Sequence, residues 1–120
     1  MNTKKWTGKP QLASESSTLG AIIDYLERKR IRYVRVHPVR LVSRKGKTFP
    51  GRIKASQKGA PDLVIATPHG QTLWVETKCA VGKVRREQAL WQQDLYLAGH
   101  IHYYIRSIDE FLGVARVFGL

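Results

Sequence analysis

The stretch GAPDLVIATPHGQTLWVETK, residues 59–78, constrains the fold more strongly than any other part of the chain. It contains two strand-like runs, DLVIA at 62–66 and TLWVETK at 72–78, separated by the turn-forming segment TPHGQ. Short runs of this kind on both sides of a turn are typical of two paired strands. The sequence therefore predicts a hairpin whose strands are largely buried.

Charged residues stand at one end of this predicted hairpin. Side chains alternate along a strand, so Trp74, Glu76 and Lys78 share one face. The turn brings the start of the first strand beside the end of the second, which places Asp62 close to Glu76 and Lys78. Two neighbouring carboxylates repel each other, and burial strengthens the repulsion. Lys78 and a hard divalent ion such as Mg²⁺ could both compensate. Taken alone, a Glu-x-Lys pattern is more often an ordinary ion pair.

The net charge indicates the kind of partner. The chain of 120 residues has 21 Lys and Arg against 9 Asp and Glu, giving a formal charge of +12. A small basic protein attracts polyanions, of which nucleic acid is the leading candidate and an anionic membrane surface the alternative. No basic helix with a broad apolar face stands out, and no apolar run approaches the roughly 20 residues that span a bilayer. We therefore expect no membrane partner.

The N-terminus and the cysteine content favour a cytoplasmic protein. The segment MNTKKWTGKP lacks the apolar core of a secretory signal, and Cys79 is the single cysteine, so no internal disulfide can form. We expect a flexible basic arm at 1–12 and one domain at 13–120. That length fits a single core.

The order of the expected elements predicts an α/β domain with a mixed β-sheet flanked by helices. The basic stretch 38–58 is long for a loop, and LVSRKGKTF within it could form a hairpin with RKGK at its turn. The helices are expected at 14–30, 84–99 and 107–118, and the strands at 31–37, 62–66, 72–78 and 100–107.

The first expected helix carries a candidate site residue. Leu19, Ile22, Ile23 and Leu26 recur at helical spacing, and Glu15 lies four residues before Leu19, so it extends their stripe. A carboxylate at that position either interacts with the helix dipole or belongs to a site, and its place in the first turn favours the dipole.

Five ordered pieces of the sequence resemble a known family. They are Glu15, G-A-P-D-L at 59–63, V-E-T-K at 75–78, Gly82, and a segment around Glu87, Gln88 and Trp91. G-A-P-D-L followed by V-E-T-K resembles the PD-(D/E)XK nuclease motif. The whole set, which covers about residues 14–107, is similar to the stand-alone VRR-NUC nucleases of phages and bacteria.

The resemblance implies a restriction-endonuclease-like core and a set of site residues. Glu15, Asp62 and Glu76 would form an acidic site for Mg²⁺ or Mn²⁺, with the backbone carbonyl of Thr77 as a further ligand. Lys78 would be the catalytic lysine, orienting or deprotonating the attacking water or stabilising the developing charge. Gln88 would be an accessory active-site residue. Glu15 is then a site residue rather than only a dipole partner.

The resemblance also implies a substrate and an assembly. The activity would be hydrolysis of DNA phosphodiester bonds, selective for a Holliday junction or other branched DNA, inside a bacterial cell or a phage-infected host. A homodimer would present two equivalent sites to such a junction. The segment GKVRREQ lacks the Ser or Thr that often caps the Gln-bearing helix in the family. The expected DNA-contacting residues are Arg35, Arg40, Arg44, Lys45, Lys47, Ser56, Lys58, Lys83, Arg85 and Arg86.

Two other function classes fit parts of the sequence. A non-catalytic nucleic-acid-binding module would keep the basic surface, and a structural protein would use the acids as ordinary ion pairs. His100 and His102 could share a strand face and bind a metal, although strand histidines are more often structural. Trp74 and Trp91 are expected in the core, and Trp6 is the better candidate for stacking on a base.

Overall fold

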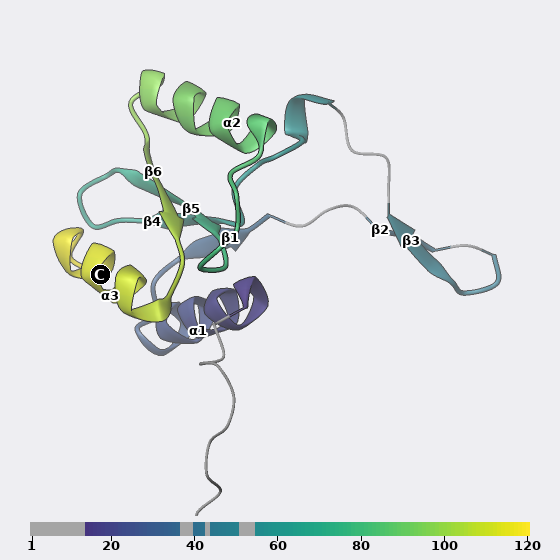
Figure 1. Cartoon of the computed structure of the whole chain (residues 1–120). Coiled ribbons are helices and arrows are strands. Elements are labelled where there is room, and N and C mark those ends of the chain that lie inside the picture. The colour runs from purple at the N-terminus through teal and green to yellow at the C-terminus, as the bar shows by residue number, and fades with distance from the viewer. Residues whose placement is uncertain (1–13, 37–39, 43, 51–54) are drawn as a thin grey trace, which may run out of the picture.

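The computed structural model describes residues 14–36, 40–42, 44–50 and 55–120, and it shows an α/β fold with two sheets (Figure 1). The arm at 1–12, including Trp6, lies outside the described residues. The helices are α1 (Glu15–Arg28), α2 (Arg86–Leu97), α3 (Ile108–Val117) and a short 3-10 helix at Ala55–Gln57. The strands are β1 (Tyr33–Arg35), β2 (Arg40–Val42), β3 (Thr48–Pro50), β4 (Leu63–Ala66), β5 (Thr72–Thr77) and β6 (Ile101–Ile105).

The main sheet has four strands in the order β1-β4-β5-β6. The predicted hairpin is confirmed, because β4 and β5 pair antiparallel with Leu63 opposite Val75 and Ala66 opposite Thr72. β6 pairs with β5 in parallel, so the chain crosses over between them through α2. The sheet is therefore mixed, as the order of elements predicts.

The basic loop contains the second sheet. β2 and β3 pair antiparallel, with Leu41 opposite Phe49, and residues 44–47 form the turn between them. The hairpin expected within LVSRKGKTF is thus present. Gly46 has φ of +79°, which a turn residue without Cβ adopts at no steric penalty.

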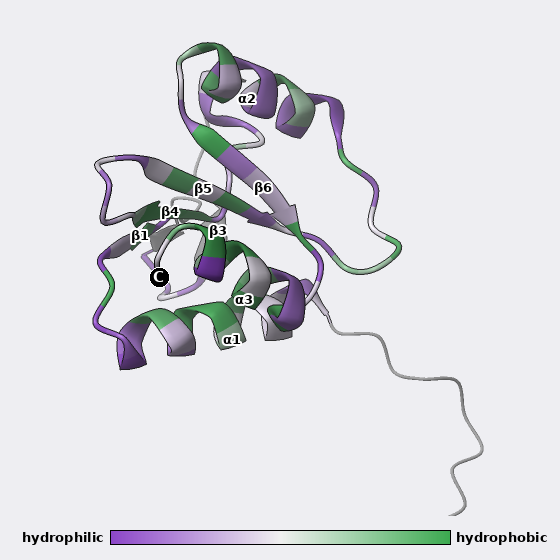
Figure 2. Cartoon of the chain, turned by 90° about the vertical axis from the view of Figure 1, so that its left-hand side faces the viewer, coloured by the Kyte–Doolittle hydropathy of each residue, from purple (hydrophilic) through white to green (hydrophobic). Residues whose placement is uncertain are grey.

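Two helices cover one face of the main sheet. α1 and α3 pack against it through the fully buried side chains of Leu63, Ile65, Leu73, Val75 and Ile105, which alternate along the strands. Figure 2 shows long hydrophobic stretches on these two helices, whereas α2 on the other face is mostly hydrophilic. The face towards α2 is consequently the more polar one.

Three of the helix ends lie at residues that commonly cap helices. Ser14 Oγ accepts a hydrogen bond from Ser17 N at 3.1 Å, and Ser107 Oγ accepts one from Glu110 N at 3.1 Å. Gly99, with φ of +86°, follows the end of α2. The first strand is shorter than the expected 31–37.

Glu15 extends the stripe of α1 by its spacing, but its own side chain is exposed. The buried residues of the stripe are Thr18, Ile22 and Leu26, and Glu15 precedes Thr18 by three residues in the first turn. Within the described residues, no helix has the length and apolar character needed to cross a membrane.

Candidate functional site

Asp62 is fixed at the open end of the β4–β5 hairpin. Its Oδ2 accepts hydrogen bonds from Thr77 N at 2.8 Å and from Thr77 Oγ1 at 2.7 Å. The register that pairs Leu63 with Val75 continues to Asp62 beside Glu76, so the two acidic residues lie on neighbouring strands. The sequence-based placement of this pair is confirmed.

Glu76 is the most unusual ionisable group in the described part of the chain. Its side chain is only 6% exposed, and its Oε1 accepts a hydrogen bond from Gln88 Nε2 at 2.8 Å. Its Oε2 is buried and has no hydrogen-bond partner among the described residues. The pKa of Glu76 is raised to about 8, chiefly by burial and then by the charge of Asp62, with a smaller contribution from Glu15, while Lys78 partly offsets these effects.

Gln88 connects this carboxylate to the start of α2. The helix begins at Arg86 after the N-cap Arg85, where the sequence offers no Ser or Thr. Gln88 Oε1 accepts the backbone N–H of Arg85 at 3.0 Å, which satisfies one of the donors left free near the helix start. The same amide therefore caps the helix and donates to Glu76.

Lys78 lies just beyond the end of β5 and is 4% exposed. Its backbone N–H donates to Ile105 O at 2.9 Å, which extends the pairing with β6. Sequence reasoning missed the residue that holds the next loop. Arg106 Nη1 donates to Cys79 O at 2.6 Å and to Gly82 O at 2.9 Å.

Glu15 affects the site through its charge, although its side chain is not buried there. It contributes to the raised pKa of Glu76 and therefore lies near it, although its side chain is exposed. In the part of the chain that the structure describes, no three acidic, histidine or cysteine side chains converge closely enough to hold a metal. Asp62 and Glu76 are held together, and Glu15 stands at the rim.

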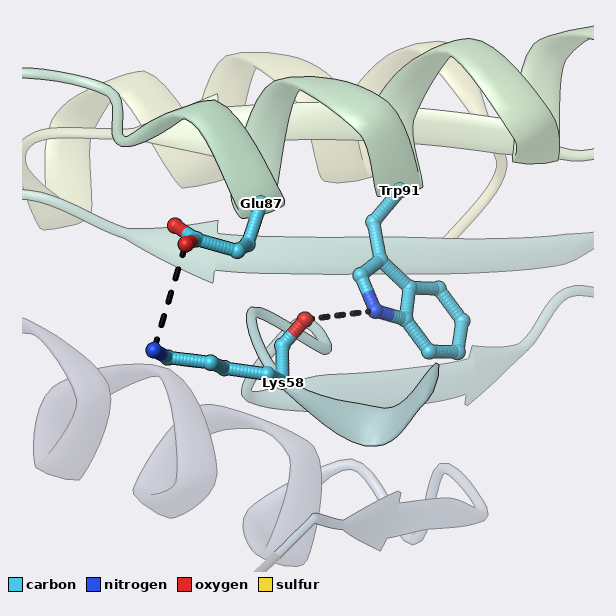
Figure 3. Close-up of polar contacts among 3 residues, drawn as sticks. All are labelled: Lys58, Glu87 and Trp91. Carbon is cyan, nitrogen blue, oxygen red and sulfur yellow. Dashed lines mark hydrogen bonds and ion pairs between the residues drawn. The ribbon is translucent and has the colours of Figure 1, made fainter. Parts of the chain in front are cut away.

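Beside the site, the segment before Asp62 is clamped to α2. Trp91 Nε1 donates to Lys58 O at 3.1 Å, and Lys58 Nζ lies 3.9 Å from Glu87 Oε1 (Figure 3). Gly59 has φ of +84°, and a Cβ built on it would lie 2.7 Å from Glu87 Cβ. Only glycine allows this segment to approach the helix so closely.

The expected DNA-contacting residues are mostly exposed and come from several elements. Arg35 lies on the edge strand β1, and Lys83, Arg85 and Arg86 lie before or at the start of α2. Arg40 belongs to β2. The remaining exposed members are in the hairpin turn, at Arg44, Lys45 and Lys47, and in or after the 3-10 helix, at Ser56 and Lys58.

The aromatic residues on the α2 face are half-buried rather than core. The rings of Trp74 and Trp91 lie 6.1 Å apart, between the sheet and α2. His100 Nδ1 and Thr72 Oγ1 are 2.7 Å apart, so this histidine takes part in a local hydrogen bond.

No protein-family model matches this chain, and neither does any curated protein or any solved structure.

Proposed function

We propose that the chain is a metal-dependent endonuclease that hydrolyses DNA phosphodiester bonds, with a PD-(D/E)XK core and selectivity for a Holliday junction or other branched DNA. The proposal rests on the surroundings of Glu76. A buried carboxylate with one oxygen free lies beside a second carboxylate, Asp62, and two residues before a buried lysine, Lys78. These groups stand at one end of two adjacent strands in a chain of charge +12.

The residues of the site fit a divalent cation. Glu76 is buried and Asp62 beside it is half-buried, and holding two carboxylates side by side away from water is unfavourable without a compensating charge. Mg²⁺ or Mn²⁺ would be held by Asp62, Glu76 and the Thr77 carbonyl, with Glu15 as a further acidic ligand. The bound ion would supply Lewis-acid activation of the phosphate and of the attacking water.

The protein side chains have separate roles in the proposal. Gln88 orients the Glu76 carboxylate, because its amide is itself fixed by the helix cap. Lys78 places an ammonium group beside the carboxylates, where it would orient or deprotonate water or stabilise charge on the phosphate. Arg106 fixes the loop after Lys78 through the carbonyls of Cys79 and Gly82.

One uncharged face favours a homodimer. The open groove between α2 and β6 is lined without a single Lys, Arg, Asp or Glu, at Ala89, Gln92, Gln93, Tyr96 and 100–103. Tyr96 and Leu97 beside it are 77% and 72% exposed. Two chains of charge +12 repel each other, so a face free of charge is where a second copy can approach. Among the described residues β6 is the last strand of the sheet, and its outer edge adjoins this face.

Cleavage assays on four-way junction, flap, duplex and single-stranded DNA, with and without Mg²⁺ or Mn²⁺, test the proposal. We expect metal-dependent cutting that Glu76→Gln and Lys78→Ala each abolish. Asp24→Asn, which removes an exposed acid from the same protein, is the matched control and should leave cutting unchanged.

The same variants separate catalysis from binding. In EDTA, Glu76→Gln should still bind DNA with the salt sensitivity of the wild type, since the basic side chains are untouched. Salt-sensitive binding without cutting on any substrate, with either metal, would instead identify a non-catalytic nucleic-acid-binding module. Cutting that survives in Lys78→Ala would remove that residue from the mechanism.

A further inference from the structure

Buried polar atoms without partners are concentrated on one face of the main sheet. Among the described residues, four buried side-chain atoms lack a hydrogen-bond partner, and three of them are Glu76 Oε2, His102 Nδ1 and Tyr104 OH. The fourth, Thr18 Oγ1, is on α1. Each such atom normally costs about 1–3 kcal/mol, so three in one place require an explanation.

The pairing of β5 with β6 brings these three side chains together. Glu76 is the register partner of Tyr104, and Trp74 is the partner of His102, so all four side chains point to the same face. The rings of His102 and Tyr104 lie 4.7 Å apart in an edge-to-face arrangement. Burial raises the pKa of Tyr104, and the charge of Glu76 raises it further.

The three atoms have complementary hydrogen-bonding capacity. Glu76 Oε2 accepts when the carboxyl group is ionised and donates when it carries a proton, the hydroxyl of Tyr104 donates or accepts, and a nitrogen of a neutral imidazole accepts or donates according to the tautomer. Burial lowers the pKa of His102, which favours the neutral ring. None of the three atoms has a hydrogen-bond partner among the described residues, and one small group with donors and an acceptor could satisfy all of them.

We propose that ordered water occupies this position, hydrogen-bonded to Tyr104 OH, Glu76 Oε2 and His102 Nδ1, and that Tyr104 is a positioning residue for the Glu76 carboxylate. Buried waters typically make about three hydrogen bonds to polar groups that are otherwise unsatisfied. His102 also lines the groove between α2 and β6, a space of about 650 Å³.

The proposal gives Glu76 two restraints. Gln88 holds Oε1 from α2, and Tyr104 holds Oε2 from β6 through water, so the carboxylate is fixed from both sides. Outer partners of this kind orient metal-binding carboxylates. The positioning role rests on the proposed function, whereas the water site itself does not.

Tyr104→Phe tests the water site through the sign of its effect on stability. Removing a hydroxyl that has no partner leaves the midpoint of urea unfolding unchanged or raises it, whereas removing one that holds water lowers it. We expect a lower midpoint in EDTA. Tyr103→Phe is the matched control, because it makes the same change one residue earlier on a more exposed ring that packs against Phe118 at the end of α3, and it should have little effect.

A second measurement tests the connection to Glu76. Mn²⁺ binding, measured by titration without DNA, should weaken at least about 10-fold in Tyr104→Phe and stay unchanged in Tyr103→Phe.

An unchanged or raised unfolding midpoint, or a high-resolution crystal structure without water density at Glu76 Oε2, would overturn the water site. Unchanged Mn²⁺ affinity with a lowered midpoint would overturn the positioning role alone. A protein that binds Mn²⁺ as expected and cuts no DNA would contradict the nuclease proposal and leave this one standing.

Discussion

Gln88 and Glu76 are joined by a hydrogen bond of 2.8 Å from the Gln88 amide nitrogen to one carboxylate oxygen. The oxygen of the same amide accepts the backbone N–H of Arg85 at 3.0 Å. A single side chain therefore completes the first turn of α2 and holds the buried acid of β5. Because the amide uses both ends, it cannot rotate without losing one of the two bonds.

Replacing Gln88 by Ala removes both bonds. We expect the free energy of unfolding to fall by about 1–3 kcal/mol, because a buried carboxylate loses its donor. If the proposed function is right, the rate of DNA cleavage should fall by about 10- to 100-fold. Urea unfolding and single-turnover cleavage measure the two effects. Gln92→Ala, one turn later on α2, should change stability by less than about 0.5 kcal/mol.

The raised pKa of Glu76 makes stability depend on pH. Between its ordinary value of 4.5 and about 8, the folded protein keeps a proton on Glu76 that the unfolded chain has lost. Stability therefore falls as pH rises through this window, by at most about 1.4 kcal/mol per pH unit. Glu76→Gln removes this contribution, so its stability relative to wild type should increase with pH. Urea unfolding in EDTA across pH 5–9, read as that difference, measures the effect, and a constant difference would contradict it.

Gly59 offers a test of the clamp between the segment before Asp62 and α2. Gly59→Ala forces a left-handed φ on an alanine and places its Cβ 2.7 Å from Glu87. Gly70→Ala forces a similar φ of +77° but meets nothing within 4 Å. The strain alone costs about 1–2 kcal/mol in both variants. We expect a clearly larger loss of unfolding free energy in Gly59→Ala, and equal losses would show that the close approach contributes nothing.

The hairpin and its paired acids could be predicted because they depend on local rules. Two apolar runs and a turn define β4 and β5, and alternation along the strands then brings Asp62 beside Glu76. The helix ends at Ser14, Gly99 and Ser107 were equally readable, since each cap forms within a few residues.

The restraints on Glu76 could not be read in the same way. The contact with Gln88 depends on how α2 packs on the sheet, and the position of Tyr104 depends on the parallel register of β6 beside β5. Arg106 was missed for the same reason, although it follows directly after β6. The spacing of Glu15 does continue the stripe of α1, but spacing alone could not show that a side chain in the first turn stays exposed.

The proposed dimer face predicts a change in mass. Tyr96→Lys and Leu97→Lys together place two charges on the uncharged groove face of each chain. If that face joins two copies, the double variant should be monomeric by light scattering at a concentration where the wild type is dimeric. Leu112→Lys, on the exposed side of α3, is the control and should stay dimeric. A dimer that survives the double variant would move the interface elsewhere.

The basic hairpin turn predicts a change in the salt dependence of DNA binding. Replacing Arg44, Lys45 and Lys47 by Gln should weaken binding and reduce the slope of log K against log salt by up to about 0.9 for each lost phosphate contact. The matched control removes the same charge at Arg28, Lys29 and Arg30. Lys29 and Arg30 line a pocket with Ala66, at the end of β4 opposite Asp62. Binding titrations on duplex and junction DNA in EDTA measure both slopes. An equal change of slope in the two triple variants would mean that only the net charge of the protein affects DNA binding, and that the turn does not contact DNA.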